Sequence, residues 1–311
     1  MLSVRAYTAA DAPAWDALVA ASRNGNLLHC RGYMDYHAER FVDASLLVER
    51  DGMPVAVFPA NRDGAEVVSH AGLSYAGLLS SHGLRAVATL EAFERIAAYY
   101  RNAGVQRLFY KAVPHVFHRS PAEEDLYALH RLGAQLYRRD LSSAVALREP
   151  PRLTSARRRS ISKARQAGLR VQRTVDPAPL HALLSEVLHR HDTRPVHRLD
   201  ELRLLCARFP EQIVPYEVRD GDTLLAASLV YDFGHVVHTQ YLACSEQGKR
   251  VDALSLLLAE LIEHVYVQRD FLSLGISTNQ QGRELNAGLV EQKERFGARA
   301  VVHDFYVWDL P

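Results

Sequence analysis

The alternation of hydrophobic and polar positions predicts the same hairpin twice. Residues 46–58 (LLVERDGMPVAVF) alternate on both sides of Asp51-Gly52, a dipeptide typical of tight hairpin turns. Residues 214–231 (VPYEVRDGDTLLAASLVY) repeat this pattern around Asp220-Gly221. We therefore predict two β-hairpins, one in each half of the chain.

Each predicted hairpin is followed by the same order of elements. The matching segments are 88–104 and 251–268 (helical period), 105–113 and 270–276 (short apolar strands), and 129–147 and 293–310 (a helix end, a Gly-Ala turn and a closing strand). Matching elements are separated by about 160 to 170 residues, which indicates tandem copies of one unit.

The repeat predicts an α/β protein of the α+β type with two tandem domains. Each domain is expected to hold a mixed, mostly antiparallel sheet flanked by helices. At 311 residues and 48% hydrophobic content, the chain is long enough for two cores. We place the N-terminal domain at 1–149, a connecting helix at 150–168 and the C-terminal domain at 169–311.

The connecting segment is strongly basic. Residues 155–171 (SARRRSISKARQAGLRV) carry six Arg and Lys side chains and no acidic residue. Pro150-Pro151 ends the first domain, Thr154 or Ser155 is available as the helix cap, and Gly168 ends the helix. A narrow apolar stripe predicts packing on the second domain or across the joint.

The bulk composition limits the partners. The formal net charge is only +1, so the basic run is a local feature and DNA is not an expected partner. Cys30, Cys206 and Cys244 are odd in number and widely spaced, which argues against a disulfide framework or a thiolate metal cage. With no signal-peptide or membrane-spanning pattern, a cytoplasmic protein without membrane attachment is expected.

A candidate anion site lies in the second half. In 241–258 (YLACSEQGKRVDALSLLL), a predicted strand ends and a helix begins around Gly248, Lys249 and Arg250. Backbone N–H groups, the helix dipole and two cations at a helix start favour a phosphate.

This order of elements, with an anion-binding turn before the central helix, resembles the GNAT acyltransferase fold, in which that turn holds the pyrophosphate of acyl-CoA. Two such units joined by a basic helix resemble the Fem-type (FemAB-like) aminoacyltransferases. The phrases GYMDYHAERF, GLSYAGLL, YKAVPHVFHRSPAEEDLYALHRLGA and FLSLGISTNQQGRELNAGLVEQKERFGAR are most similar to GNAT-superfamily sugar N-acyltransferases of bacterial surface-polysaccharide pathways, such as those of lipopolysaccharide O-antigen.

The resemblance implies an N-acyltransferase that moves an acyl group from acyl-CoA, as acetyl-CoA or a short hydroxyacyl-CoA, to the amino group of a nucleotide-linked sugar such as a dTDP-3-amino-3,6-dideoxyhexose. It implies small-molecule substrates, no metal, and a monomer or homodimer. One alternative is a Fem-type peptidyltransferase that uses aminoacyl-tRNA on a cell-wall precursor. Another is a degenerate tandem protein that binds a nucleotide or CoA without turnover.

The resemblance also assigns donor contacts to the second half. The expected cofactor-binding residues are Gln240, Leu242, Gln247, Gly248, Lys249, Arg250, Ala253, Asn279 and Asn286. The turn departs from the family pattern, because Val251 and Asp252 stand where glycines would ease the approach of phosphate. Asp252 would repel a phosphate, or as an N-cap it could instead satisfy the backbone.

Acyl transfer to an amine needs a base, an oxyanion donor and a proton for the leaving thiolate. Tyr241 is a candidate proton donor, and Lys293 resembles a Fem-type lysine close to the donor phosphate or reaction centre. The candidates for the base, which spacing alone does not separate, are His70, His115, His238 and Glu291. Of these we place His115 and Glu291 with Tyr241 and Lys293 in the catalytic set.

The acceptor is expected on the first domain and the basic helix. The candidate contacts are Tyr36, His37, Tyr75, Lys111, Arg158 and Arg165. The pairs HVFH and HVVH lack a third ligand nearby, and GLSYAG does not have the spacing of a nucleophilic serine turn. A metal centre and a serine hydrolase are therefore not expected.

Overall fold

The computed structural model describes residues 1–149, 153–190 and 192–310, which form two compact units. Unit 1 comprises Met1–Asp140, Asn279–Glu284 and Val302–Pro311, and unit 2 comprises Leu141–Thr278 and Leu285–Val301. The units are therefore not contiguous in the chain, whereas the repeat predicted a single division near residue 150. Pro150-Pro151, the predicted end of the first domain, lies outside the described residues.

Two long strands account for this exchange of segments. β9 (Gln135–Ala146) has its first residues in unit 1 and its last in unit 2, and β17 (Arg299–Asp309) begins in unit 2 and ends in unit 1. Because strands can pair with partners far away in sequence, neither assignment follows from the local pattern of the repeat.

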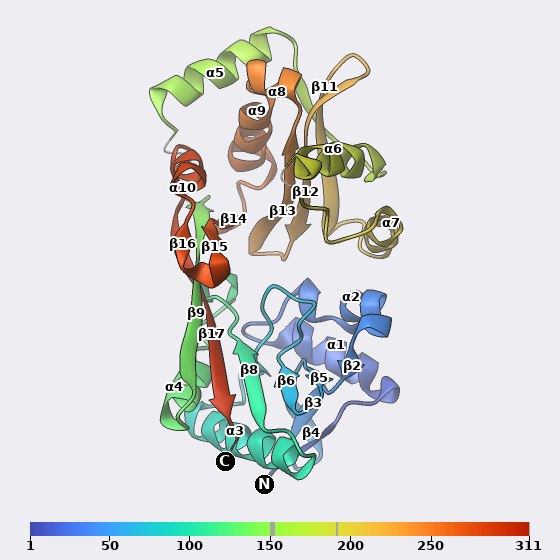
Figure 1. The fold of residues 1–311 in the computed structure, drawn as a ribbon, viewed down its shortest axis with the longest axis vertical. Coiled ribbons are helices and arrows are strands. Elements are labelled where there is room, and N and C mark those ends of the chain that lie inside the picture. The colour runs from blue at the N-terminus through green and yellow to red at the C-terminus, as the bar shows by residue number, and fades with distance from the viewer. Residues whose placement is uncertain (150–152, 191, 311) are drawn as a thin grey trace. The chain divides into compact units, whose positions relative to one another are not determined.

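Unit 1 contains two groups of strands (Figure 1). The first is antiparallel, in the order β1-β3-β4-β7, and the second runs from the end of β17 through β8, β6 and β5 to β2. The bounds are β1 Leu2–Ala6, β2 Val42–Asp43, β3 Leu46–Arg50, β4 Met53–Phe58, β5 Asn61–Asp63, β6 Glu66–Val68, β7 Leu79–Ser80 and β8 Arg107–Lys111.

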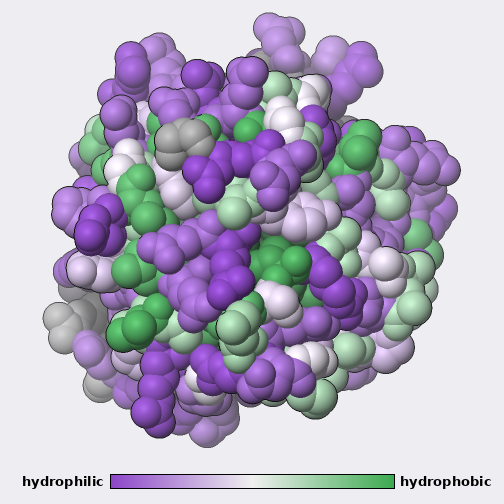
Figure 2. All heavy atoms as spheres, turned by 90° about the horizontal axis from the view of Figure 1, so that it is seen from below, coloured by the Kyte–Doolittle hydropathy of each residue, from purple (hydrophilic) through white to green (hydrophobic). Residues whose placement is uncertain are grey.

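Unit 1 also contains helices, of which α3 and α4 pack on a core that includes large aromatic side chains. Their bounds are α1 Ala12–Ala21, α2 Arg31–Met34, α3 Ala86–Asn102 and α4 Glu124–Arg131. Phe93 and Tyr100 of α3 pack with Phe58 and Tyr110 in one buried cluster. Seen from the end that carries α3 and both chain termini, the surface is mostly hydrophilic with small separate apolar patches (Figure 2). That distribution is expected of a helix that buries one face and exposes the other.

Unit 2 is built on strands in the order β10-β11-β12-β13-β14, with the last residues of β9 beside β14. The strands from β10 to β13 are antiparallel, while β13 and β14 are parallel. The bounds are β10 Arg170–Arg173, β11 Ile213–Asp220, β12 Thr223–Asp232, β13 Val236–Cys244 and β14 Phe271–Ile276. A minor pair, β15 (Thr278–Asn279) and β16 (Glu284–Leu285), follows β14.

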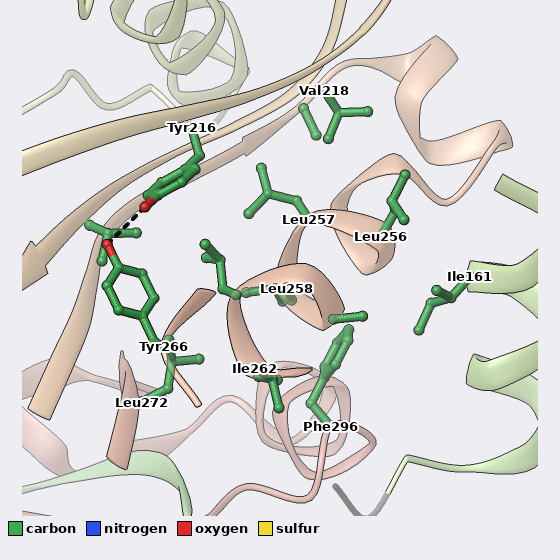
Figure 3. Packing of buried hydrophobic residues seen from close by; sticks show 14 of the residues in the cluster. Ile161, Tyr216, Val218, Leu256, Leu257, Leu258, Ile262, Tyr266, Leu272 and Phe296 are labelled. Atoms are coloured by element: carbon green, nitrogen blue, oxygen red, sulfur yellow. Dashed lines mark hydrogen bonds between the residues drawn. The ribbon is translucent and has the colours of Figure 1, made fainter. Parts of the chain in front are cut away.

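Helices cover both faces of the unit 2 sheet (Figure 1). α9 and α5 contribute Leu257 and Ile161 to a cluster with Phe296 on one face, where the hydroxyls of Tyr216 and Tyr266 lie 3.1 Å apart (Figure 3). On the other face, side chains of α6 pack against β13. The bounds are α5 Ser155–Gln166, α6 Ala178–His189, α7 Leu199–Arg208, α8 Glu246–Arg250, α9 Ala253–Glu260 with a π-helical turn Leu261–Val265, and α10 Ala287–Glu294.

The basic helix forms as the sequence predicted. The Thr154 hydroxyl caps α5 by accepting the N–H of Arg157, and Gly168 follows the helix with a φ of +85°. Ile161 and Ala164 are buried against unit 2. The predicted apolar stripe is therefore confirmed as the packing face of this helix.

The two hairpins differ by one residue in their turns. In the first, Arg50 pairs with Met53, so Asp51-Gly52 forms the turn as predicted. In the second, Asp220 pairs with Thr223, so the turn consists of Gly221 and Asp222 rather than Asp220-Gly221. The second prediction was wrong by one position. Both hairpins have the same register and a β-bulge at the equivalent place, between Val48 and Glu49 and between Val218 and Arg219, but the second Asp-Gly dipeptide lies one residue closer to the bulge.

Candidate functional site

The candidate site lies where β13 and β14 of unit 2 stop pairing. Their ladder consists of Val236 with Phe271, Val237 with Leu272 and His238 with Ser273. β13 then continues to Cys244 with β12 as its partner, and within the described residues no strand pairs with its other edge. Backbone N–H and C=O groups on such an edge can bind an extended ligand in the manner of an added strand.

A β-bulge at Gln240 marks this point of divergence. Thr239 pairs with Val230 and Tyr241 pairs with Leu229, so Gln240 is the extra residue on β13. A bulge bends its strand and increases the local twist, which explains why β13 turns away from β14 here. The base of the divergence is closed by side chains, since the Thr239 hydroxyl donates to the Ser273 carbonyl at 3.2 Å. His238 Nδ1 lies 3.1 Å from the Ser273 hydroxyl.

Lys293 reaches from α10 to the end of β14. Its Nζ donates to the carbonyls of Gly275 at 2.7 Å and Ile276 at 2.9 Å, and to the Ser277 hydroxyl at 2.8 Å. An ammonium group has three donors, so all of them bind the protein itself. Burial lowers the pKa of Lys293 to about 8. Lys293 therefore lies at the site, and its ammonium holds the end of β14 in the place where β13 no longer pairs.

The predicted phosphate turn forms a short helix, α8, after β13. The Ser245 hydroxyl caps it by accepting the N–H of Gly248 at 3.0 Å. A Cβ at Gly248 would overlap the carbonyl oxygen of Leu225, so this glycine serves the packing of α8 on β12. Lys249 forms an ion pair with Glu246 at 2.7 Å, while Gln247 and Arg250 are exposed.

Asp252 separates α8 from α9 and is held by the basic helix. Its φ of +54° lies in the left-handed region that favours glycine. Its carboxylate accepts from the Ser160 hydroxyl and lies 3.5 Å from Arg157 Nη1, both on α5. The acidic side chain at the donor turn is thus fixed by its own partners. Ala253, the first residue of α9, is fully buried.

Tyr241 points to the opposite face of the sheet, where it contacts His197. The phenol oxygen lies 2.6 Å from His197 Nδ1 and accepts the backbone N–H of His197 at 3.3 Å. Burial raises the pKa of Tyr241, so the phenol keeps its proton at neutral pH. Leu242, the next residue on β13, is partly buried and packs against the main core of unit 2.

The remaining predicted residues of the C-terminal half differ in their exposure and in their contacts. Asn286 caps α10 by accepting the N–H of Leu289 at 3.0 Å. Glu291 is exposed and forms an ion pair with Arg295 at 3.6 Å. Asn279 is exposed at the end of β15.

On α5 the two predicted acceptor contacts differ. Arg165 forms ion pairs with Glu260 at 3.4 Å and Glu263 at 3.3 Å, whereas Arg158 is exposed.

In unit 1, the structure places His37 and Lys111 against the same loop. Lys111 Nζ donates to the carbonyls of Leu73 and Ala71, and the His37 ring lies against Gly72 between them. Burial lowers the pKa of Lys111 to about 7. Tyr36 packs on His37 with ring centroids 4.1 Å apart.

His70 starts this loop in a strained conformation. It is buried with a φ of +55°, and burial lowers its pKa to about 3. A non-glycine residue with this φ is uncommon and is often retained at functional positions.

Tyr75 and His115 lie in other parts of unit 1. The Tyr75 ring stacks on Phe117 at 4.7 Å and its hydroxyl accepts from Asn26 at 3.0 Å, so it is a buried core residue. His115 is exposed at the start of a short 3-10 helix, His115–Phe117.

Three solved structures resemble the chain over nearly its whole length. FemX has a TM-score of 0.70 with 10% identity, covering 99% of this chain and 97% of that one. The C-terminal DUF2156 domain of a putative lysylphosphatidylglycerol synthetase from Agrobacterium fabrum has a TM-score of 0.62 with 12% identity, covering 96% and 92%. A tandem GNAT protein from the clavulanic acid biosynthesis pathway has a TM-score of 0.55 with 13% identity, covering 100% and 99%. The chain has a tandem GNAT fold.

Residues 152–278 match the family model described as the acetyltransferase (GNAT) domain. This segment contains the predicted phosphate turn, the bulge at Gln240 and the divergence of β13 from β14. No curated protein sequence matches the chain. The GNAT resemblance predicted from the sequence is confirmed in the fold, and the solved structures, at their low identities, support no more than the fold.

Two further observations concern the residues that the structure describes. None of their helices is both long and apolar enough to span a membrane. No group of three or more His, Cys, Asp or Glu side chains among them is arranged to hold a metal ion.

Sequence reasoning missed three residues of this region. His197, the partner of Tyr241, lies 44 positions away on another element and carries no motif. The partners of Asp252, Ser160 and Arg157, lie on α5, where the sequence led us to assign only Arg158 and Arg165, as acceptor contacts. The apolar stripe of α5 was the available signal, since it faces α9 and so places Ser160 beside the donor turn.

Proposed function

We propose that the protein is an N-acyltransferase whose unit 2 holds the activated acyl donor. The observation that carries this proposal is the unpaired edge of β13 beyond the Gln240 bulge. An acyl donor with an extended amide arm, such as the pantetheine of CoA, can hydrogen-bond along such an edge. The match of residues 152–278 to a GNAT domain supports the same reaction class.

The proposed chemistry is direct attack of a neutral amine on the acyl carbonyl. The new N–C bond forms, the C–S bond of the thioester breaks, and a proton moves from the amine to the thiolate. Backbone N–H groups of β13 near Gln240 would stabilise the oxyanion. Tyr241, which keeps its proton, is our candidate donor to the thiolate, and our candidates for the base are His70, His115, His238 and Glu291.

For the substrates, we propose acyl-CoA as the donor and a nucleotide-linked amino sugar as the acceptor. The support is the resemblance of the sequence to sugar N-acyltransferases, with Tyr36, His37 and Lys111 as acceptor contacts. Purified protein should release free CoA thiol from acetyl-CoA only when an amino sugar nucleotide is present. No thiol release across a panel of such sugars would reject this pair of substrates.

A second candidate function is aminoacyl transfer from tRNA, as in the Fem-type proteins. The specific observation in its favour is Asp252, because a fixed carboxylate at the donor turn opposes the binding of a pyrophosphate. In addition, Arg158, Arg159 and Lys163 are exposed on α5, and no ion pair to any described residue engages them. Cations of this kind suit the phosphates of a nucleic acid.

Two variants separate the donors. If CoA binds at the turn, Asp252→Gly should tighten CoA binding about tenfold, since it removes a negative charge and glycine tolerates a positive φ. Asp192→Gly is the matched control, because Asp192 is exposed in unit 2 with a similar φ of +52°. If tRNA is the donor, the double variant Arg158→Glu/Arg159→Glu should weaken tRNA binding and reduce its salt dependence. The same double variant should leave CoA binding unchanged.

A further inference from the structure

A cavity of about 430 Å³ lies in unit 2, beside the start of α7. Its lining comes from α6, the segment that connects α6 to α7, and the first residue of α7. The lining residues are His181, Ser185, His189, Thr193, Arg194, Pro195, His197, Arg198 and Leu199. Its volume is in the range of small-molecule sites. None of the residues discussed for the acyl donor lines it.

The side chains around the cavity are suited to a negative charge. Among the described lining residues, three are histidines, two are arginines and none is acidic. Arg198 is partly neutralised by Asp200 at 3.2 Å and Glu201 at 3.6 Å. Arg194 is exposed and has no ion pair with any described residue. The cavity therefore offers an uncompensated guanidinium beside imidazole rings, while the hydroxyls of Ser185 and Thr193 donate to backbone carbonyls.

The inner wall of the cavity is fixed by hydrogen bonds. His197 is only 4% exposed, and its Nδ1 lies 2.6 Å from the Tyr241 hydroxyl. The same Tyr241 oxygen accepts the backbone N–H of His197 at 3.3 Å, so the residue is held to β13 through both its ring and its backbone. His181 Nε2 lies 3.2 Å from the His197 carbonyl and ties α6 to the same wall. Two rings of the wall are thus held before any ligand arrives.

We propose that this cavity binds a small organic anion, a carboxylate or a phosphate monoester. The charged group would meet Arg194 and the imidazoles, and the apolar part of the ligand would lie against Pro195 and Leu199. A planar guanidinium binds either anion through two parallel hydrogen bonds. The site is independent of the choice of acyl donor, although its wall residue His197 contacts the hydroxyl of Tyr241 on β13.

The test is direct binding to the full chain, measured by titration calorimetry. The probes are phenyl phosphate and benzoate, which carry the two anionic groups on the same apolar ring. Binding of one and not the other identifies the charged group that the cavity accepts. Saturable binding with a stoichiometry of one is expected for at least one probe, and no binding of either at millimolar concentration would overturn the proposal.

Variants locate the binding. Arg194→Gln should raise the dissociation constant about tenfold, the loss expected for one charge-assisted hydrogen bond. His181→Gln should also weaken binding, because it removes the ring that ties α6 to the His197 carbonyl in the cavity wall. The matched control is Arg159→Gln, which removes the same charge from an exposed position on α5. If Arg159→Gln weakens binding as much as Arg194→Gln, the probes respond to overall charge and the cavity is not the site. Because no acyl donor is used, a failure here leaves the acyltransferase proposal untouched.

Discussion

Units 1 and 2 follow the same order of elements, but the strand before the long helix is much longer in unit 2 than in unit 1. In unit 2 this strand is β13, which runs from Val236 to Cys244 and leads into a capped helix, α8. In unit 1 its counterpart is β7, only Leu79–Ser80, and α3 begins at Ala86 without a side-chain cap. A strand of two residues has no long free edge to offer, so the feature that supports donor binding is present in one copy alone.

Both units nevertheless bury one lysine near the strand that follows the long helix. Lys111 ends β8 in unit 1, and Lys293 binds the end of β14 in unit 2. Each ammonium binds backbone carbonyls instead of a carboxylate. In both units, therefore, a buried ammonium fixes a chain segment through its backbone carbonyls, although the two lysines occupy different positions in the repeat.

The largest expected effect concerns the close packing of α8 in unit 2. Gly248→Ala should lower the free energy of unfolding by about 3 kcal/mol, because the added methyl group meets the Leu225 carbonyl. Urea denaturation followed by circular dichroism measures the change. Gly288→Ala is the matched control, since its nearest neighbour, Asn286 Oδ1, would be 3.9 Å away. Equal stability of the two variants would show that α8 is not held against β12.

The next effect tests the role of Lys293. Lys293→Met should lower the free energy of unfolding by about 2 kcal/mol, because two carbonyls and one hydroxyl lose their donor while a buried charge is removed. It should also lower kcat more than it changes KM for the acyl donor, since the side chain positions β14 and all three donors bind the protein. An increase in KM alone, with wild-type stability, would instead identify Lys293 as a donor contact.

A pH series compares the buried lysines of the two units. Burial lowers the pKa of Lys111 from 10.5 to about 7, so between these values the unfolded chain binds more protons than the folded one. Stability should therefore rise with pH in this window, by up to about 1.4 kcal/mol per pH unit. Lys111→Met should remove the rise between about pH 7 and 8 and reduce it above pH 8, where Lys293 also contributes. For Lys293 the window begins near pH 8, so Lys293→Met should flatten the curve only above that value.

Urea midpoints at half-unit pH steps measure these slopes. Lys163→Met, an exposed lysine on α5, controls for the loss of one positive charge. A wild-type slope that persists in Lys111→Met would assign the pH dependence to other groups.

The smallest effect concerns the basic helix α5 of unit 2. Thr154→Ala should destabilise the protein by about 1 kcal/mol, because the N–H of Arg157 loses the hydroxyl that caps α5. Ser162→Ala, at an exposed position of the same helix, should leave stability nearly unchanged. Thermal denaturation of the two variants provides the comparison, and equal midpoints would show that the Thr154 cap does not stabilise α5.

Local features of the fold could be predicted from the sequence. The Asp51-Gly52 turn, the Thr154 cap and the Gly168 stop each depend on residues within a few positions of one another. The repeat itself was visible because hydrophobic periodicity is a property of short windows. These are the features whose energies arise from the neighbouring backbone.

Features that depend on distant pairing could not be predicted. The exchange of β9 and β17 between the units has no local signature, and the partners of Lys293 are backbone carbonyls, which every residue carries. The engagement of Asp252 with α5 likewise joins residues that are 92 positions apart. Sequence reasoning therefore located the turn between β13 and α9 but not the contacts that hold Asp252.

The division of β17 has a consequence for the order in which the protein is synthesised. Residues 107–111 of β8 pair with 305–309 of β17, which the ribosome adds almost two hundred residues later. Until then, β8 presents an open strand edge, and such edges promote mispairing between nascent chains. Unit 1 begins first and is completed last, so translation that pauses within unit 2 should leave the N-terminal half exposed to aggregation.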